Sequence, residues 1–358
     1  LRTPARTNAY LRAGIGNYIT PEIEGYILRR MNENSLISGN VNFRSSDGHL
    51  DYQDSGFRYF DVNGLYSKKL KNNTRVAVKA DFYNDFNRIF DLAATVPNDN
   101  SGTAKKDYLG LNAGFILSGN KNVLEGWEYF LNLASTGIDL SAPNTAFKGE
   151  ISEQSLKTGF EKNWAGSKLN ETLSTRIDLK AGNYTSESVG NTQWVDVEWN
   201  LGYNMLFNYK TKISISGGLG YIADGFNNKV LFVTNSSVDH SVNNKFSIKA
   251  SVFATPEMKT AWEHHQTNRF LNTSTQLEYE YTYGAEGGIE FTPIMGTKLF
   301  GLLRFENISN KAFYTREEQN FGGNLEPLYY DVNYGNASVF ELKTGITQQL
   351  ITDKLWFD

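Results

Sequence analysis

The sequence has no cysteine, no long hydrophobic run and no excess of basic residues, and each absence excludes a class of protein or site. A chain without cysteine forms no disulfide and offers no thiolate to a metal. No stretch approaches the run of about 18 apolar residues that a transmembrane helix needs. The formal net charge is −4 and the pI is near 5.7, so we expect no nucleic-acid partner.

Aromatic residues are abundant although the chain as a whole is polar. They make up 14% of the sequence, with 20 Tyr and 23 Phe, whereas all hydrophobic residues together make up 40% and the mean hydropathy is −0.45. A soluble protein normally buries so many aromatic side chains in an apolar core, which raises its mean hydropathy. A membrane β-barrel explains both figures, because its lipid face is aromatic and aliphatic while its lumen and loops are polar. A soluble β-sandwich is the alternative.

The clearest local pattern lies in residues 277–306. From Leu277 to Phe291, apolar or small residues alternate with carboxylates and other polar or small residues at every second position. Turn residues follow at 292–296, and a second alternating run then begins. This pattern predicts a long antiparallel hairpin. Soluble strands have about 5 or 6 residues, whereas strands that cross a membrane need about 9 to 11, so the length favours an outer-membrane barrel.

Similar runs recur along the whole chain, with short turns alternating with longer polar loops. We therefore predict an all-β fold: one antiparallel transmembrane β-barrel domain over residues 1–358, with roughly 14 to 18 strands. A last strand begins at Leu355, just before the chain stops, so we expect the polypeptide to continue beyond Asp358. The one helical pattern is short, at residues 257–267. Long loops are expected near residues 85–106, 222–244, 254–275 and 315–337.

Charged residues occupy the polar positions of the alternating runs. In a barrel they would form an ionic lining that hydrates the lumen and influences ion passage; paired acids for acid–base catalysis are the alternative. The candidate lumen-lining residues are Arg75, Lys79, Asp81, Arg176, Asp178, Lys180, Glu278, Glu280, Glu286, Glu290, Lys298, Arg304, Glu341 and Lys343.

Tyrosine and tryptophan residues near the expected strand ends predict girdles at the two membrane interfaces; ordinary strand propensity is the alternative. These residues are Tyr10, Tyr18, Tyr26, Tyr66, Trp127, Trp164, Trp194, Tyr209, Tyr314, Tyr329 and Tyr330.

Other candidate sites favour a structural role. Adjacent His264 and His265 would point to opposite faces of a strand, and Glu257 is too distant to complete a metal site on a short helix, so we expect a surface loop. The oxygen-rich segment 98–102 lacks the glutamate of an EF-hand loop. No G-x-S-x-G motif occurs. We therefore expect no catalytic residue, no metal site and no cofactor.

Several segments carry a family resemblance. Tyr10–Tyr18, Glu24–Ile27 and Tyr283–Glu290 are similar to strands and turns of TonB-dependent-receptor-like barrels of Bacteroidota and related phyla. Further segments of this kind are Phe313–Tyr314, Tyr330–Val332 and Val339–Leu342. The resemblance implies the outer membrane of a Gram-negative bacterium. It also implies, for true receptors, an N-terminal energy-coupling box and a globular plug. Because barrel-type strands begin at about Asn8, we expect a barrel without a plug.

The sequence thus favours a non-enzymatic outer-membrane transport barrel for small polar solutes, either a passive channel or a plug-less relative of TonB-dependent receptors. Outer-membrane lipid is its expected surrounding. The alternative is a structural or accessory subunit of a larger outer-membrane complex, with an occluded lumen and other envelope proteins as partners. A barrel hydrolase is a third hypothesis.

Overall fold

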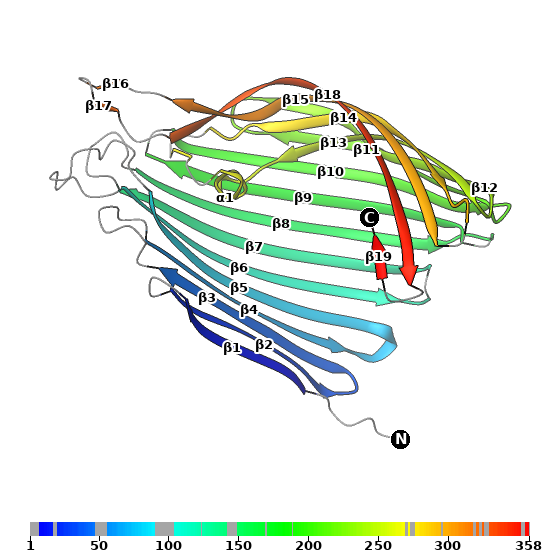
Figure 1. The fold of residues 1–358 in the computed structure, drawn as a ribbon, viewed down its shortest axis with the longest axis horizontal. Helices are drawn as coiled ribbons and strands as arrows, with labels where there is room; N and C mark the ends of the chain where they lie inside the picture. The colour runs from blue at the N-terminus through cyan, green and yellow to red at the C-terminus, as the bar shows by residue number, and fades with distance from the viewer. Residues whose placement is uncertain are drawn as a thin grey trace.

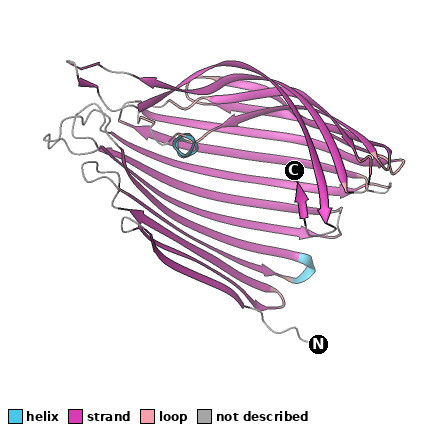
Figure 2. Ribbon diagram, viewed as in Figure 1, coloured by secondary structure: helices cyan, strands magenta, loops and turns pink. Residues whose placement is uncertain are grey.

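The computed structural model shows a chain that is almost entirely β-strand (Figure 2). The structure describes residues 7–16, 20–46, 56–89, 104–122, 124–141, 149–168, 170–187, 189–268, 271–272, 276–294, 296–317, 320–321, 324–325, 329–351 and 355–357.

The strands are long, and most of them exceed the length needed to cross a membrane. Their bounds are β1 Thr7–Gly16, β2 Thr20–Asn32, β3 Ser35–Ser46, β4 Phe57–Lys69, β5 Thr74–Ile89, β6 Ala104–Asn120, β7 Gly126–Ser141, β8 Gly149–Ala165, β9 Thr172–Ser186, β10 Gly190–Phe207, β11 Thr211–Ala223, β12 Asn228–Asn243, β13 Phe246–Met258, β14 Tyr279–Phe291, β15 Thr297–Glu317, β16 Asn320–Phe321, β17 Asn324–Leu325, β18 Tyr329–Ile351 and β19 Leu355–Phe357. The described residues include two helical segments, a 3₁₀ turn η1 (Lys71–Asn73) and the helix α1 (Ala261–Thr267).

One antiparallel sheet of 17 strands organises the molecule. Each strand pairs with the next one along the chain, from β1 to β15 and then through β18 to β19, while β16 and β17 form a separate small ribbon. The sheet curls around an interior that holds α1 (Figure 1). The predicted all-β antiparallel fold is confirmed, and its sixteen long strands lie within the predicted range. The predicted hairpin at 277–306 is the pair β14 and β15.

The two ends of the sheet differ in their connections. The turn end has the connections 33–34, 70–73, 121–125, 166–171, 208–210, 244–245, 292–296 and 352–354. The loop end has the connections 17–19, 47–56, 90–103, 142–148, 187–189, 224–227, 259–278 and 318–328. Short turns at one end and several longer connections at the other are the asymmetry of outer-membrane barrels. The helix α1 belongs to the loop end, in the connection between β13 and β14.

Strands occupy much of the four ranges in which we expected long loops. The expectation for 222–244 is wrong, because β12 fills most of this range. Its Asn and Ser residues lie on a strand whose outer positions carry Val230, Phe232 and Val238. Strands also extend into the other three ranges: β5 and β6 into 85–106, β13 into 254–275, and β15 and β18 into 315–337. No helix in the described part of the chain is long and apolar enough to cross a membrane.

The hydrophobic core lies inside the loop end of the sheet. It contains Tyr108, Ile138, Ile151, Tyr184, Trp194, Ile222, Met258, Ala261, Leu277 and Tyr279. These residues come from β6 to β11, β13 and β14 and from the segment that carries α1. The core therefore joins the sheet to the connection 259–278.

Candidate functional site: the interior of the sheet

All fourteen candidate lumen-lining residues fall on one face of the sheet. The strand register links them: Asp81 lies opposite Asn112, Lys180 opposite Asp196, and Arg304 opposite Glu286 and Glu341. Side chains alternate between the faces of a strand, so the remaining candidates take the same face at every second position. Glu278 directly precedes β14 in the same alternation. Because α1 packs against side chains of this face, it is the inner face.

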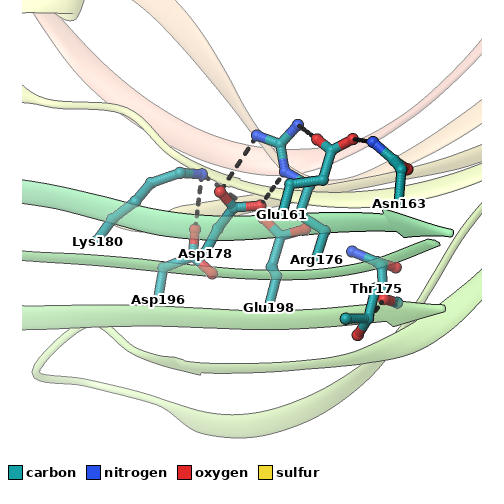
Figure 3. A network of polar contacts seen from close by, with 9 residues as sticks. Glu161, Asn163, Thr175, Arg176, Asp178, Lys180, Asp196 and Glu198 are labelled. Atoms are coloured by element: carbon teal, nitrogen blue, oxygen red, sulfur yellow. Dashed lines mark hydrogen bonds and ion pairs between the residues drawn. The ribbon is translucent and has the colours of Figure 1, made fainter. Parts of the chain in front are cut away.

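The inner face carries an ion-pair network on β8, β9 and β10 (Figure 3). The Arg176 guanidinium donates to both carboxylate oxygens of Asp178, at 2.5 and 3.2 Å, and lies 3.7 Å from Glu161. The Lys180 ammonium lies 3.0 Å from Asp196 and 3.6 Å from Glu198. The network satisfies charges that would otherwise be costly to hold away from bulk water.

A second set of ion pairs lines β14, β15 and β18. The Arg304 guanidinium lies 2.5 Å from Glu306 and 3.9 Å from Glu286. Lys298 pairs with Glu290 at 2.8 Å and Lys343 pairs with Glu341 at 2.8 Å.

Five candidates remain: Lys79, Asp81 and Glu280, which form ion pairs, and Arg75 and Glu278. Lys79 pairs with Asp81 at 2.8 Å, and Glu280 accepts from Lys259 at 3.0 Å. Arg75 donates to the hydroxyl of Ser67, and no carboxylate pairs with it among the described contacts. Burial and the neighbouring Asp224 raise the pKa of Glu278. The structure thus joins most candidates into local pairs along the wall.

Sequence reasoning missed three members of the first network. Glu161, Asp196 and Glu198 were not among the candidates, although they occupy the inner positions of β8 and β10. The alternation of Asp196 and Glu198 with Val195, Val197 and Trp199 could have found two of them. Glu161 lies in a run with weaker alternation, and only its register opposite Arg176 identifies it.

Several cavities lie along this inner face. One of ≈ 710 Å³, near the turn end, is lined by Arg75, Glu128 and Glu161. One of ≈ 460 Å³ is lined by Arg176, Lys180 and Glu198 together with neighbours on β7 to β13. Another, of ≈ 330 Å³, is lined by Glu290 and Lys298. The ion pairs therefore border open space. Among the described residues, no group of three or more metal-ligating side chains is placed to hold a metal ion.

The first turn of α1 is capped by reciprocal hydrogen bonds between Thr260 and Glu263. The Thr260 hydroxyl accepts from the Glu263 amide at 3.2 Å, and the Glu263 carboxylate accepts from the Thr260 amide at 2.8 Å. This capping box satisfies two amides that would otherwise lack partners. Burial alone would raise the pKa of Glu263, but the hydrogen bonds from Thr260 and the nearby Lys157 hold it below its ordinary value.

One face of α1 packs on the wall formed by β5, β6 and β8. The Trp262 ring stacks on Tyr83 with centroids 4.1 Å apart and meets Tyr108 edge-on at 5.6 Å. Tyr83 lies across Gly110 of the next strand, where any side chain would collide with its ring. Glycine at position 110 therefore allows the tyrosine to lie flat under the tryptophan. Glu153 of β8 accepts from the Trp262 amide at 3.5 Å.

The two histidines of α1 reach opposite walls. His265 Nδ1 lies 2.7 Å from the Lys106 ammonium, which also donates to the Leu271 carbonyl. His264 lies within hydrogen-bond distance of the Tyr314 hydroxyl, at 3.1 Å, and of the Tyr334 hydroxyl, at 3.3 Å. These tyrosines belong to β15 and β18, whereas Lys106 belongs to β6. The helix thus bridges strands that lie far apart in the sheet.

The expectation of a surface loop at His264 and His265 is wrong, because the two side chains are 0% and 1% exposed. Adjacent residues on a helix diverge by about 100°, so each ring meets a different wall. Burial lowers the pKa of His264 to about 4. Burial and then the charge of Lys106 lower the pKa of His265. Both rings are neutral at pH 7.

The girdle prediction also needs correction at several positions. Trp194 is 1% exposed and belongs to the interior core, and Tyr314 contacts His264. The register places Tyr10 and Tyr26 opposite each other on the inner face. Their rings lie with centroids 6.1 Å apart and are 41% and 46% exposed.

The hydrophobic pattern reverses along the strands near the loop end. On β10, Val195, Val197, Trp199 and Leu201 point outward, whereas the outward positions nearer the loop end are Asn191 and Gln193. The inner position changes in the opposite sense, from Asp196 to the buried Trp194. On β8 the outer positions near the loop end are Gln154 and Ser152, and the inner Ile151 is buried. The outer side chains of these strands therefore change from apolar to polar at this level.

No family model matches the sequence, and no curated protein matches it. Solved structures do match its fold. The copper transporter OprC superposes with a TM-score of 0.71 at 9% identity, over 98% of this chain and 60% of that one. The siderophore receptor PirA from Pseudomonas aeruginosa gives 0.69 at 13%, over 97% and 63%. The FrpB iron transporter from Neisseria meningitidis (F3-3 variant) gives 0.69 at 9%, over 95% and 60%.

The fold is that of the barrel of TonB-dependent outer-membrane receptors. At this level of identity the likeness shows the fold alone. The chain spans less than two thirds of the length of these matched proteins.

Proposed function

We propose that the protein is a non-enzymatic transport barrel of the Gram-negative outer membrane, formed as one domain, whose interior passes small polar solutes. One observation carries the proposal: along the same strands, ion-paired side chains line the inner face while apolar side chains cover the outer face. Such a wall suits lipid outside and water inside. The loop end then faces the exterior and the turn end the periplasm.

The charges of the interior are largely paired with one another. Arg176 with Asp178, Lys180 with Asp196 and Arg304 with Glu306 are local pairs of opposite sign. A wall of this kind offers donors and acceptors to a polar solute without a strong field of one sign. This supports polar cargo of low net charge. The siderophore, iron and copper named for the matched proteins belong to those proteins, because only the fold is shared.

Planar lipid bilayers test the proposal. The purified protein is expected to give conductance steps, and the double variant Lys298→Glu and Lys343→Glu, at inner-face lysines that are 47% and 59% exposed, is expected to shift the reversal potential toward cation selectivity. Lys121→Glu is the matched control, because this lysine lies in a turn and is 77% exposed. A bilayer that stays sealed at high protein load would contradict the proposal, as would a reversal potential that the double variant leaves unchanged.

A structural or accessory subunit of a larger outer-membrane complex is the second candidate. The observation that favours it is α1, which occupies part of the interior. Stable co-purification with other envelope proteins after mild extraction would support this role. A monodisperse lone barrel would count against it.

A further inference from the structure

The apolar core inside the loop end does not serve a water-filled passage. Ile138, Ile151, Tyr184 and Ile222 are at most 2% exposed, although they point to the same face as the ion pairs deeper in the sheet. An aqueous lumen would place polar groups at these positions. Their burial shows that the mouth is packed as the core of a soluble protein is.

The chain's own connection between β13 and β14 covers these residues. Its described parts are 259–268, 271–272 and 276–278, of which Ala261, Leu271 and Leu277 are 0% or 1% exposed. The Trp262 ring packs on β5 and β6, and His264 contacts β15 and β18. The connection therefore spans the mouth from one wall to another.

The connection is also a separable element. A helix of seven residues is too short to be stable by itself in water, so α1 is ordered by its contacts with the walls. Apart from the chain linkage at β13 and β14, and a backbone bridge of Leu271 with Tyr330 of β18, these contacts are side-chain packing and hydrogen bonds. The pairing of the strands does not depend on them. Release of α1 would leave the sheet intact and would open the space that α1 fills.

We propose that α1, with its described flanks at 259–260 and 268, is an internal gate: docked, α1 narrows the loop-end mouth of the barrel, and its release into solvent widens the path. This inference rests on the proposed transport function. It assigns Trp262, His264 and His265 to holding the gate closed. The gate needs no other protein, because α1 and the strands that it contacts belong to the same chain.

The experiment measures docking and conductance in parallel. The chain has no cysteine, so the Ala261→Cys variant carries a single thiol at a position that is 0% exposed. Adding Trp262→Ala is expected to raise the modification rate of this thiol about tenfold or more and, in bilayers, to enlarge the unit conductance. Gln266→Ala is the matched control on the exposed side of α1 and is expected to change neither quantity.

A cross-linked variant guards against misfolding of the tryptophan variant. The Lys157 ammonium on β8 lies 3.6 Å from the Glu263 carboxylate on α1. In the double variant Lys157→Cys and Glu263→Cys, a short thiol cross-linker can therefore fix α1 to the wall. In the variant that also carries Trp262→Ala, cross-linking the two cysteines is expected to restore the small conductance.

The outcomes separate the two proposals. Faster thiol modification with unchanged unit conductance overturns the gate, and so does a large conductance that persists after cross-linking. Bilayers that stay sealed with every variant overturn the transport function itself.

Discussion

Asp196 is the most deeply buried carboxylate of the interior network. Its side chain is 0% exposed, and one of its oxygens meets the Lys180 ammonium at 3.0 Å. Lys180 is 28% exposed and also reaches Glu198. Removing one partner of a buried pair leaves the other charge uncompensated, which costs far more than the pair contributes in net terms.

The Lys180→Met variant should therefore lower the free energy of unfolding by about 3–5 kcal/mol, the usual cost of breaking a buried pair. The measurement is urea unfolding of the protein in lipid vesicles. The control is Lys121→Met, which breaks the exposed pair with Glu125 and should cost at most about 1 kcal/mol. Equal losses in the two variants would contradict the burial argument.

The histidines make the docking of α1 depend on pH. His264 faces Tyr314 and Tyr334 on the strands, with Lys259, Glu263 and Glu280 close enough to affect its charge. Its pKa is about 4 when docked and near 6.5 in the released helix. The released form therefore binds a proton first. The contribution of His264 to docking is fully present above about pH 6.5 and weakens as the pH falls toward about 4.

The same reasoning holds for His265, whose ring faces Lys106 and Tyr108. We expect the thiol of the Ala261→Cys variant to gain accessibility between pH 6.5 and 4, relative to an exposed reference thiol in Gln266→Cys. Replacing both histidines with glutamine should flatten this dependence. A constant ratio of the two modification rates in the histidine-containing protein would refute it.

The strand β10 shows how an element matches the membrane. Its outer face is apolar from Val195 to Phe207, apart from the hydroxyl of Tyr203. These twelve steps cover about 40 Å along the strand, which at a tilt near 40° is roughly 30 Å of height, close to the hydrocarbon thickness. The outer polar residues Asn191 and Gln193 then lie above this layer.

Lysine substitutions on the outer face of β10 should show this depth. Leu201→Lys, at the middle of the apolar stretch, should cost about 2–4 kcal/mol of stability in vesicles, whereas Asn191→Lys should cost about 0–1 kcal/mol. Both side chains point outward, so the two substitutions lie on the same face of the sheet and differ in their depth in the membrane. Unfolding titrations of the two variants in the same lipid make the comparison, and similar losses would contradict the assigned depth.

Alternation along β14 and β15 was sufficient to predict the hairpin and the face of its charged residues, because a period of two is local information. The reversal near Trp194 was not predictable in this way, since the same alternation continues while the surroundings change. Asn235, Ser237 and Ser241 of β12 resembled a loop because their inward position is set by neighbouring strands. The docking of α1 was not predictable, because it depends on Tyr83, Lys106 and Tyr334, which are far from α1 in the sequence.

At the scale of the whole molecule, the sheet divides into two levels. Near the turn end and through the middle, ion pairs line the inside and apolar residues cover the outside. At the loop end the inside is a buried cluster of apolar side chains that also holds Lys106, Glu153 and the two histidines of α1, and the outer positions of β8 and β10 are polar. The two levels share one continuous set of strands (Figure 1). A membrane-spanning wall with a packed external mouth accounts for both.

Spin labels along β10 test this account most directly. Labels placed one at a time from residue 190 to 202 of the protein in lipid vesicles report access to oxygen, which concentrates in lipid, and to a water-soluble nickel chelate. We predict an oxygen preference at positions 195, 197, 199 and 201, loss of this preference at 196, 198 and 200, and nickel access at the outer positions 191 and 193. An alternation with the same phase from 190 to 202, or no oxygen preference at any position, would contradict the account.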